Sequence, residues 1–321
     1  MPENPPDKTD ETSSKPEMPS ENGPLSAYGG ERPAAPDWFE KAIATPYQTH
    51  FIQSGDTQLH VQSWGTPDKP GLLLTHGNGA HAHWWDFIAP YFAAHYHIVA
   101  MTFAGMGDSA WRSGYALEAF SEDQIRTCQA LGLFEHAQKP IIVAHSFGAF
   151  VTLNTGAKYG TRFGGVVLVD SPVNPPDRPS GGPPRKARPN KIYPSLGAAL
   201  ARFRLAPPQP CENHYAMDYI ARHSLKQITD ETGKTGWVWK FDPMIWQRFH
   251  MEGQPAEMLK SMACRLAIIR GEESALMPEE VGRYMQTLLG HQVPYVSIPH
   301  AHHHVMLDQP LAFISALRML L

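Results

Sequence analysis

The apolar residues of this chain fall into two alternating patterns. Short, continuous runs rich in β-branched residues at 97–101, 141–144 and 166–169 are typical of strands that are covered on both faces. Between these runs, apolar residues recur at helical spacing from Leu117 to Leu131 and again over 147–158. Strands that alternate with helices in this way predict right-handed βαβ units and therefore a parallel sheet.

The same patterns extend this prediction over most of the chain. Three β-type runs precede the alternation, at 48–53, 57–64 and 71–75. The alternation stops at Pro172 and then resumes with a strand at 265–270, a helix at 278–289, a strand at 295–298 and a closing helix at 310–321. The predicted fold class is α/β, with a mostly parallel sheet.

Proline divides the chain into segments. Of its 30 prolines, eight lie in residues 1–36 and eleven in residues 172–210. Residues 1–36 contain few large apolar side chains and seven acidic residues, so we expect a disordered acidic tail. We expect residues 37–171 and 262–321 to form the core and residues 172–261 to form an inserted cap. This cap should be mainly helical from about Met217, with Trp237 and Trp239 as packing anchors.

The charge of the chain excludes some classes of partner. There are 27 basic and 31 acidic residues, which is far from the basic balance of a nucleic-acid-binding protein. Residues 172–210 carry a local net charge of +6. Such a charge can attract a substrate with a carboxylate or phosphate group or bind the acidic tail, but the favoured interpretation is a solvated loop.

The sequence also predicts a cytoplasmic protein without a membrane partner. It has no run of 18 apolar residues and no apolar segment at its N-terminus. Its three cysteines, Cys128, Cys211 and Cys264, are too far apart to suggest a disulfide framework or a zinc knuckle. The pattern says nothing about the oligomeric state.

Ser146 lies in the sequence context of a nucleophile. The run at 141–144 leads directly into His145-Ser146-Phe147-Gly148 and then into a predicted helix. A sharp strand–turn–helix hinge exposes the serine Oγ and requires small neighbours, which Ala144 and Gly148 provide. The N–H groups at the start of the helix suit a developing oxyanion.

A second turn supplies the other candidate oxyanion donor. His76-Gly77-Asn78-Gly79 follows the run at 71–75, and we expect the backbone N–H groups of Asn78 and Phe147 to hold the oxyanion. The remaining candidates for the wall of the substrate site are the neighbours of these turns: His76, Gly77, His145, Trp84 and Trp85. The sequence does not decide which of the two tryptophans faces the pocket.

The loop between the last strand and the last helix carries four histidines. His300, His302, His303 and His304 lie where a loop can bring a general base over the strand ends. A metal site is not expected here, because no carboxylate or cysteine cluster accompanies the histidines at a ligand spacing. One of the four should therefore be the base.

Taken in order, these motifs resemble those of the α/β-hydrolase superfamily, and in particular its capped serine-hydrolase branch. The resemblance covers about residues 48–170 and 262–321, and it includes the turn Ala104-Gly105-Met106-Gly107-Asp108-Ser109. It implies an eight-stranded type of sheet with helices on both faces and places His303 at the catalytic histidine.

The acid of the triad departs from the family pattern. The usual position after the cap is occupied by Ser274, whereas Asp170 stands at the end of the preceding strand, where some relatives carry the acid. We favour Asp170 over Glu273 and Glu272. All three choices keep the order serine, acid, histidine.

The sequence therefore predicts a cofactor-free serine hydrolase. A serine at the elbow suits cleavage of an ester, a thioester or a related acyl bond of a small molecule. It argues against haloalkane dehalogenases and epoxide hydrolases, which need a carboxylate there. Two alternatives stay open: a carbon–carbon hydrolase or lyase with the same triad, and a non-catalytic binding member of the fold.

Overall fold

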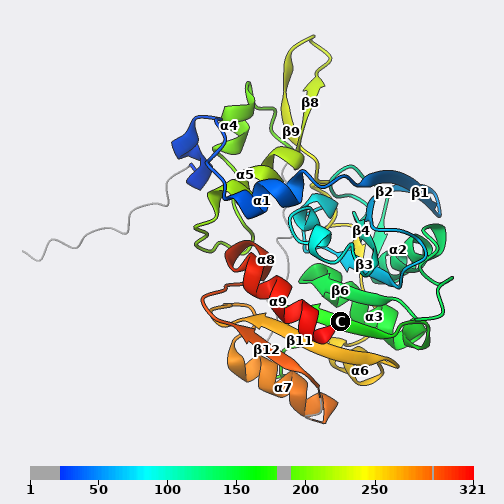
Figure 1. Cartoon of the computed structure of the whole chain (residues 1–321). Helices are drawn as coiled ribbons and strands as arrows, with labels where there is room; N and C mark the ends of the chain where they lie inside the picture. The colour runs from blue at the N-terminus through cyan, green and yellow to red at the C-terminus, as the bar shows by residue number, and fades with distance from the viewer. Residues whose placement is uncertain (1–21, 179–188, 291–292) are drawn as a thin grey trace, which may run out of the picture.

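A sheet of eight strands forms the centre of the molecule (Figure 1). The structure is a computed structural model that describes residues 22–178, 189–290 and 293–321. From one edge to the other, the strands are β1 (Gln48–Ser54), β2 (Thr57–Trp64), β4 (His97–Met101), β3 (Gly71–Thr75), β6 (Ile141–His145), β7 (Gly165–Val169), β11 (Arg265–Gly271) and β12 (Tyr295–Ile298).

The sheet confirms the predicted fold class. β2 is antiparallel to β1 and β4, and every other neighbouring pair is parallel. Each strand predicted from the apolar runs is present, and its ends differ from the prediction by at most one residue. Continuous apolar runs predict these strands well because both of their faces are buried.

Helices cover both faces of the sheet, as predicted. Leu72 and Leu74 belong to one buried cluster and Leu73 to the other, because successive strand residues point to opposite faces. The cluster around Leu73 includes residues of α2 (Leu117–Ala130), α3 (Phe147–Tyr159), α6 (Pro255–Lys260) and α7 (Glu279–Leu289). The opposite cluster includes residues of α1 (Asp37–Ile43), α8 (Val305–Asp308) and α9 (Pro310–Leu320). No helix within the described ranges is long and apolar enough to cross a membrane.

Between β7 and β11 the chain leaves the sheet. This segment contains α4 (Leu196–Leu200), α5 (His214–His223), the strands β8 (Leu225–Thr229) and β9 (Thr235–Trp239), and β10 (Phe249–His250), which pairs with β5 (Tyr115–Ala116). α6 follows before the chain re-enters the sheet. We refer to residues 172–261 as the insert.

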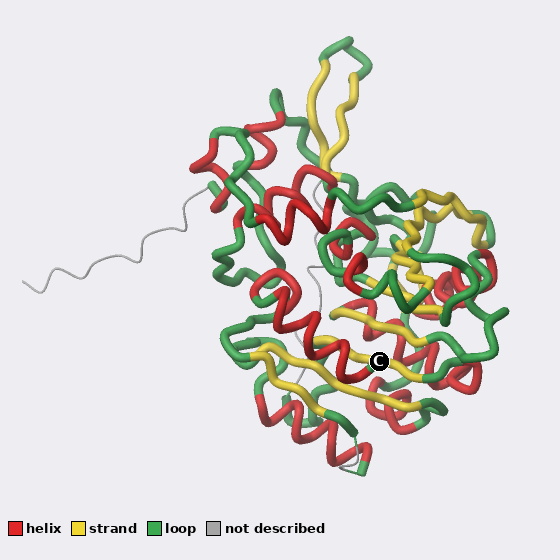
Figure 2. The backbone as a smooth tube through the Cα atoms, viewed as in Figure 1, coloured by secondary structure: helices red, strands yellow, loops and turns green. Residues whose placement is uncertain are grey.

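The expectation of helix from about Met217 is correct for α5 and wrong for residues 225–239. β8 and β9 pair as an antiparallel hairpin that extends away from the body of the molecule (Figure 2). The Asp230 carboxylate accepts hydrogen bonds from the N–H groups of Thr232 and Lys234, and Gly233 adopts a positive φ of 83°. This Asx-type turn closes the hairpin, and its signal was not recognised in the sequence.

The expectation of a disordered tail is wrong for residues 22–36, whereas residues 1–21 lie outside the described part of the chain. Pro24–Tyr28 forms a 3₁₀ helix that contacts α4 and α5, and Leu25 is only 2% exposed. The Tyr28 hydroxyl lies 3.0 Å from His214 Nδ1, and Arg222 donates to the Gly30 carbonyl at 2.6 Å. A few well-placed side chains and backbone groups order a segment whose average composition is polar.

Candidate active site

Ser146 lies at a strained turn between β6 and α3. Its φ of 52° and ψ of −117° are outside the regions that L-residues usually adopt. The turn is possible because its neighbours are small: a Cβ at Gly148 would lie 2.6 Å from the His76 carbonyl oxygen, and one at Gly77 would lie 3.1 Å from the Ser146 Cβ. The half-buried serine therefore projects from the sheet where the helix begins.

Three of the predicted catalytic side chains form one hydrogen-bonded chain. His303 Nε2 lies 2.8 Å from Ser146 Oγ, and His303 Nδ1 lies 2.8 Å from Asp170 Oδ1. Because a carboxylate can only accept, Nδ1 carries the ring proton, so Nε2 accepts the hydrogen bond from the serine hydroxyl. The His303 and Asp170 side chains are 2% and 0% exposed. This tautomer is the one that a general base next to a serine requires.

The carboxylate of Asp170 is held by two further donors. The Gly271 N–H donates to Oδ2 at 2.7 Å, and the Ser274 hydroxyl donates to Oδ1 at 2.6 Å. Ser274 occupies the position where the family pattern would place the acid, and here it supports the acid of the preceding strand. No sequence motif indicates this role of Ser274, because only the fold brings residues 170 and 274 together.

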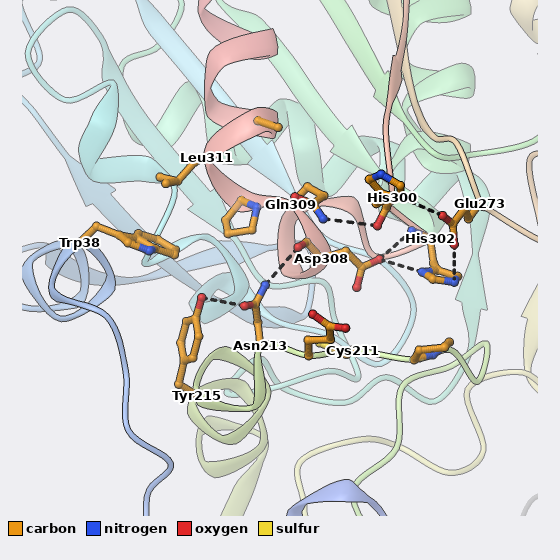
Figure 3. A pocket seen from close by; sticks show the side chains of 14 residues that line it. Trp38, Cys211, Asn213, Tyr215, Glu273, His300, His302, Asp308, Gln309 and Leu311 are labelled. Atoms are coloured by element: carbon orange, nitrogen blue, oxygen red, sulfur yellow. Dashed lines mark hydrogen bonds and ion pairs between the residues drawn. The ribbon is translucent and has the colours of Figure 1, made fainter.

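The alternative acids do not contact His303. Glu273 has a half-exposed side chain and lies 3.3 Å from His300 Nδ1 and 3.4 Å from His302 Nε2, so it lies between those two rings (Figure 3). Glu272 is exposed. Of the three candidate acids, the structure brings only Asp170 to the histidine.

The two candidate oxyanion donors lie at the turns that the sequence indicated. Phe147 is the first residue of α3, so its N–H has no helical carbonyl four residues earlier to accept its hydrogen bond. Asn78 is exposed in the turn after β3. Their role as oxyanion donors stays a prediction.

His76 serves the backbone, contrary to the expectation that it lines the substrate site. Its Nδ1 lies 2.7 Å from the Gly77 carbonyl, and its Nε2 accepts the N–H of Phe103 at 3.0 Å. The ring is 1% exposed, and burial lowers its pKa to about 4. Neutral His76 therefore fixes the turn that carries Asn78.

His145 is also buried beneath the site. Its Nε2–H donates to the carbonyl of His303 at 3.0 Å, and the side chain is 1% exposed. Burial lowers the pKa values of His145 and His304 well below the usual value, and neighbouring His303 adds to the effect. Both rings are therefore neutral near pH 7. His145 therefore supports the loop that carries His303, contrary to the expectation that it lines the substrate site.

A small cavity adjoins the turn at Asn78. Its volume is about 230 Å³, and its lining comes from Asn78, Trp84 and His304 in the core and from residues 203–206 and Phe241 in the insert. Trp84 therefore lines a pocket. Trp85 is 1% exposed and packs against Phe313, so its expected place in the substrate site is wrong. Residues 172–210 contain seven basic residues and one acidic residue, and of the basic ones Arg185, Lys186 and Arg188 lie outside the described residues.

Two groups of three described side chains bring ligand atoms within 4.8 Å of one another. The first contains His145, His303 and His304, but both ring nitrogens of His303 are already engaged by Ser146 and Asp170. The second contains His60, His83 and Asp108, where Lys240 Nζ lies 2.7 Å from the carboxylate. In each group an existing partner competes with an ion, so neither is assigned as a metal site.

Comparisons with known proteins agree with the fold. A family model described as "Alpha/beta hydrolase family" matches residues 72–316. The chain is 28% identical over 128 residues to Epoxide hydrolase A of Mycobacterium tuberculosis (strain ATCC 25618 / H37Rv), which is 39% of each chain. It is 32% identical over 101 residues to the Magnesium-chelatase 30 kDa subunit of Rhodobacter capsulatus, which is 31% of this chain and 34% of that one. The matches thus span well under two thirds of either relative.

Solved structures share the fold. The Thioesterase Domain From Curacin Biosynthetic Pathway superposes with a TM-score of 0.69 at 22% identity, over 85% of this chain and 100% of that domain. At this identity the likeness concerns the fold alone.

Proposed function

The chain belongs to the alpha/beta hydrolase family, and from this premise we propose that it is a serine hydrolase that cleaves an ester, a thioester or a related acyl bond of a small molecule. The observation that carries the proposal is the continuous chain of 2.8 Å hydrogen bonds from Ser146 through His303 to Asp170. An intact, buried chain of this kind is what nucleophilic catalysis by serine needs.

The proposed reaction starts when His303 Nε2 takes the proton of Ser146. The serine Oγ then attacks the carbonyl carbon, and the resulting oxyanion accepts hydrogen bonds from the N–H groups of Asn78 and Phe147. The intermediate collapses, and the leaving group departs with the proton that His303 returns. A water molecule, deprotonated by the same nitrogen, attacks the acyl-enzyme and regenerates Ser146.

The identity of the nucleophile separates this chain from one of its relatives. One relative is an epoxide hydrolase by name. Opening an epoxide through a covalent ester intermediate needs a carboxylate at the elbow, whereas this chain has Ser146 there. The proposal therefore does not extend the epoxide activity to this chain.

We also propose that the insert, residues 172–261, acts as a cap that selects the substrate. Residues 203–206 and Phe241 of the insert line the cavity next to Asn78. The cavity has an apolar lining, which favours a small, partly apolar acyl or leaving group. The apolar lining residues are Phe203, Leu205, Phe241 and Trp84.

The proposal can be tested by labelling with a fluorophosphonate probe, which reacts with activated serines. We expect the wild-type protein to be labelled on the peptide that contains Ser146 and the Ser146→Ala variant not to be labelled. Ser315→Ala, which changes an exposed serine on α9, is the matched control and should be labelled like wild type. A folded wild-type protein that does not react with the probe would refute the proposal.

A second assay distinguishes the type of bond. The hydrolysis of short p-nitrophenyl esters should exceed that of a vinylogous diketone acid. The opposite preference would replace the ester reaction by carbon–carbon cleavage with the same three residues.

A further inference from the structure

The backbone on either side of His303 is held by two side chains outside the triad. The N–H of His302 donates to Asp308 Oδ2 at 2.7 Å, and the N–H of His304 donates to Gln209 Oε1 at 3.0 Å. The Gln209 amide nitrogen lies 2.9 Å from both oxygens of Asp308. The two residues thus form a continuous bridge, which we call the Gln209–Asp308 clamp, around the residue that carries the catalytic ring.

One half of this clamp belongs to the insert. Gln209 lies between α4 and α5, whereas Asp308 is the last residue of α8 in the core. Close by, the Asn213 side chain donates to the carbonyl of Leu307 at 2.7 Å. It also donates to the carbonyl of Asp308 at 3.1 Å (Figure 3). The insert therefore binds the segment that follows His303 through several polar contacts.

The Asp308 carboxylate is the sheltered part of the clamp, whereas Gln209 is half-buried. The Asp308 side chain is 5% exposed, and burial raises its pKa to about 6. Hydrogen bonds in such a place are strong and directional because little water competes for them. They can fix a backbone position more precisely than contacts on an open loop.

We propose that Gln209 is a positioning residue for catalysis. Through Asp308 and the N–H of His304, it holds His303 at hydrogen-bonding distance from Ser146. The base is therefore aligned only while the insert is packed against the core. This inference rests on the proposed serine-hydrolase function. Its consequence is that one polar side chain of the insert makes the reactivity of the site depend on closure of the insert. A displacement of about 1 Å at the base is enough to slow such a reaction about 100-fold.

A merely structural role for Gln209 would have a different signature. It would lower the midpoint of thermal unfolding but leave the turnover of the folded enzyme unchanged. A role in substrate binding would raise KM and leave kcat unchanged. Positioning of His303 predicts a lower kcat and slower probe labelling at nearly constant KM.

The first test uses Gln209→Leu, which removes the hydrogen bonds of the side chain to Asp308 and to the N–H of His304 and keeps a similar volume. We expect kcat for a p-nitrophenyl ester and the rate of fluorophosphonate labelling to fall ten- to about 100-fold, with KM within about twofold. The matched control is Gln227→Leu, which changes an exposed glutamine on β8 of the same insert and should leave kcat unchanged.

The second test uses Gln209→Glu and the pH dependence of kcat. Two carboxylates less than 3 Å apart cannot both be ionised at little cost, but they can share one proton. The ratio of variant to wild-type kcat should therefore rise as the pH falls from 8 to 6, whereas the ratio for Gln209→Leu should stay constant. Asp308 also borders a second cavity, of about 670 Å³ (Figure 3). The other titratable groups that face Asp308 or line this cavity include His302 at 3.7 Å, Cys211, Asp170, Glu212, Glu273 and His300.

The outcomes separate the two proposals. If wild type is labelled and Gln209→Leu is folded with kcat within twofold of wild type, the clamp has no positioning role and the proposed function stands. If Gln209→Leu does not fold, a flat pH ratio for Gln209→Glu overturns the inference, and a rising ratio supports it. If wild type itself is not labelled, the serine-hydrolase function fails first.

Discussion

Replacing Asp170 by asparagine tests which acid completes the site. The Asp170 carboxylate accepts from three donors: the His303 ring, the Gly271 N–H and the Ser274 hydroxyl. An asparagine side chain of the same shape has only one oxygen and turns an NH₂ group toward at least one of these donors. The variant therefore loses the negative charge and disfavours the ring tautomer in which Nδ1 carries the proton.

The size of the effect follows from the charge that develops on His303. When the ring takes the serine proton, a positive charge forms next to the carboxylate, whose Oδ1 lies 2.8 Å from Nδ1. For charge centres about 4 Å apart at an effective dielectric constant of about 20, the attraction is about 4 kcal/mol. This corresponds to about a 1000-fold loss in kcat, and the wrong tautomer increases the loss toward 10,000-fold.

The assay is kcat for a p-nitrophenyl ester, together with the rate of fluorophosphonate labelling. The matched control is Glu273→Gln, since Glu273 is half-exposed and contacts His300 and His302 instead of His303. We expect this control to stay within about threefold of wild type. The reasoning would be refuted if Asp170→Asn lost less than tenfold in kcat, or if Glu273→Gln lost as much.

Three other features of the structure lead to predictions. Ser274→Ala removes a buried hydrogen bond to the Asp170 carboxylate. The free energy of unfolding, measured with urea, should fall by about 2 kcal/mol, and kcat should fall far less than in Asp170→Asn. Gly77→Ala places a Cβ 2.9 Å from His145 Nδ1 and 3.1 Å from Ser146 Cβ. Because this shifts the turn, kcat/KM should fall at least tenfold. An unchanged kcat/KM would show that the turn can accommodate the added carbon. Stability should decrease in mild acid because burial lowers the pKa values of several histidines, four of which are His76, His81, His145 and His304. These rings stay neutral in the folded state, whereas the unfolded chain binds protons below about pH 6.5. Each ring should therefore lower the free energy of unfolding by about 1.4 kcal/mol between pH 7.5 and 5.5. A urea midpoint that is constant over this range would contradict the assignment.

The sequence predicted the parts of the molecule that are local or buried on both sides. The strands were found because their runs are continuous and apolar, and Ser146 was found because a strand, small neighbours and a helix follow one another directly. Asp170 was a choice among three residues near the strand ends. The structure brings it to His303.

The parts that sequence reasoning missed depend on contacts between distant segments. From the sequence, Ser274 only occupies the position where the family pattern has an acid. Its supporting role is not visible there, because its contact with Asp170 exists only after β7 and β11 pair. Gln209 is one polar residue in a proline-rich stretch, and nothing nearby in the sequence connects it with the histidine loop. Trp84 and Trp85 are adjacent in the sequence, but only Trp84 lines the cavity, because Trp85 packs against Phe313 of α9.

The contact between the start of the chain and the insert has a consequence for protein engineering. Leu25 is buried, Gly23 donates to the Ala201 carbonyl at 2.6 Å, and Arg222 of α5 donates to Gly30. The insert is therefore not a self-contained module that can be exchanged between relatives by cutting at its two ends. A chimera that transplants residues 172–261 must also carry residues 22–36, and a version shortened to begin at Asp37 would uncover the apolar surface under Leu25.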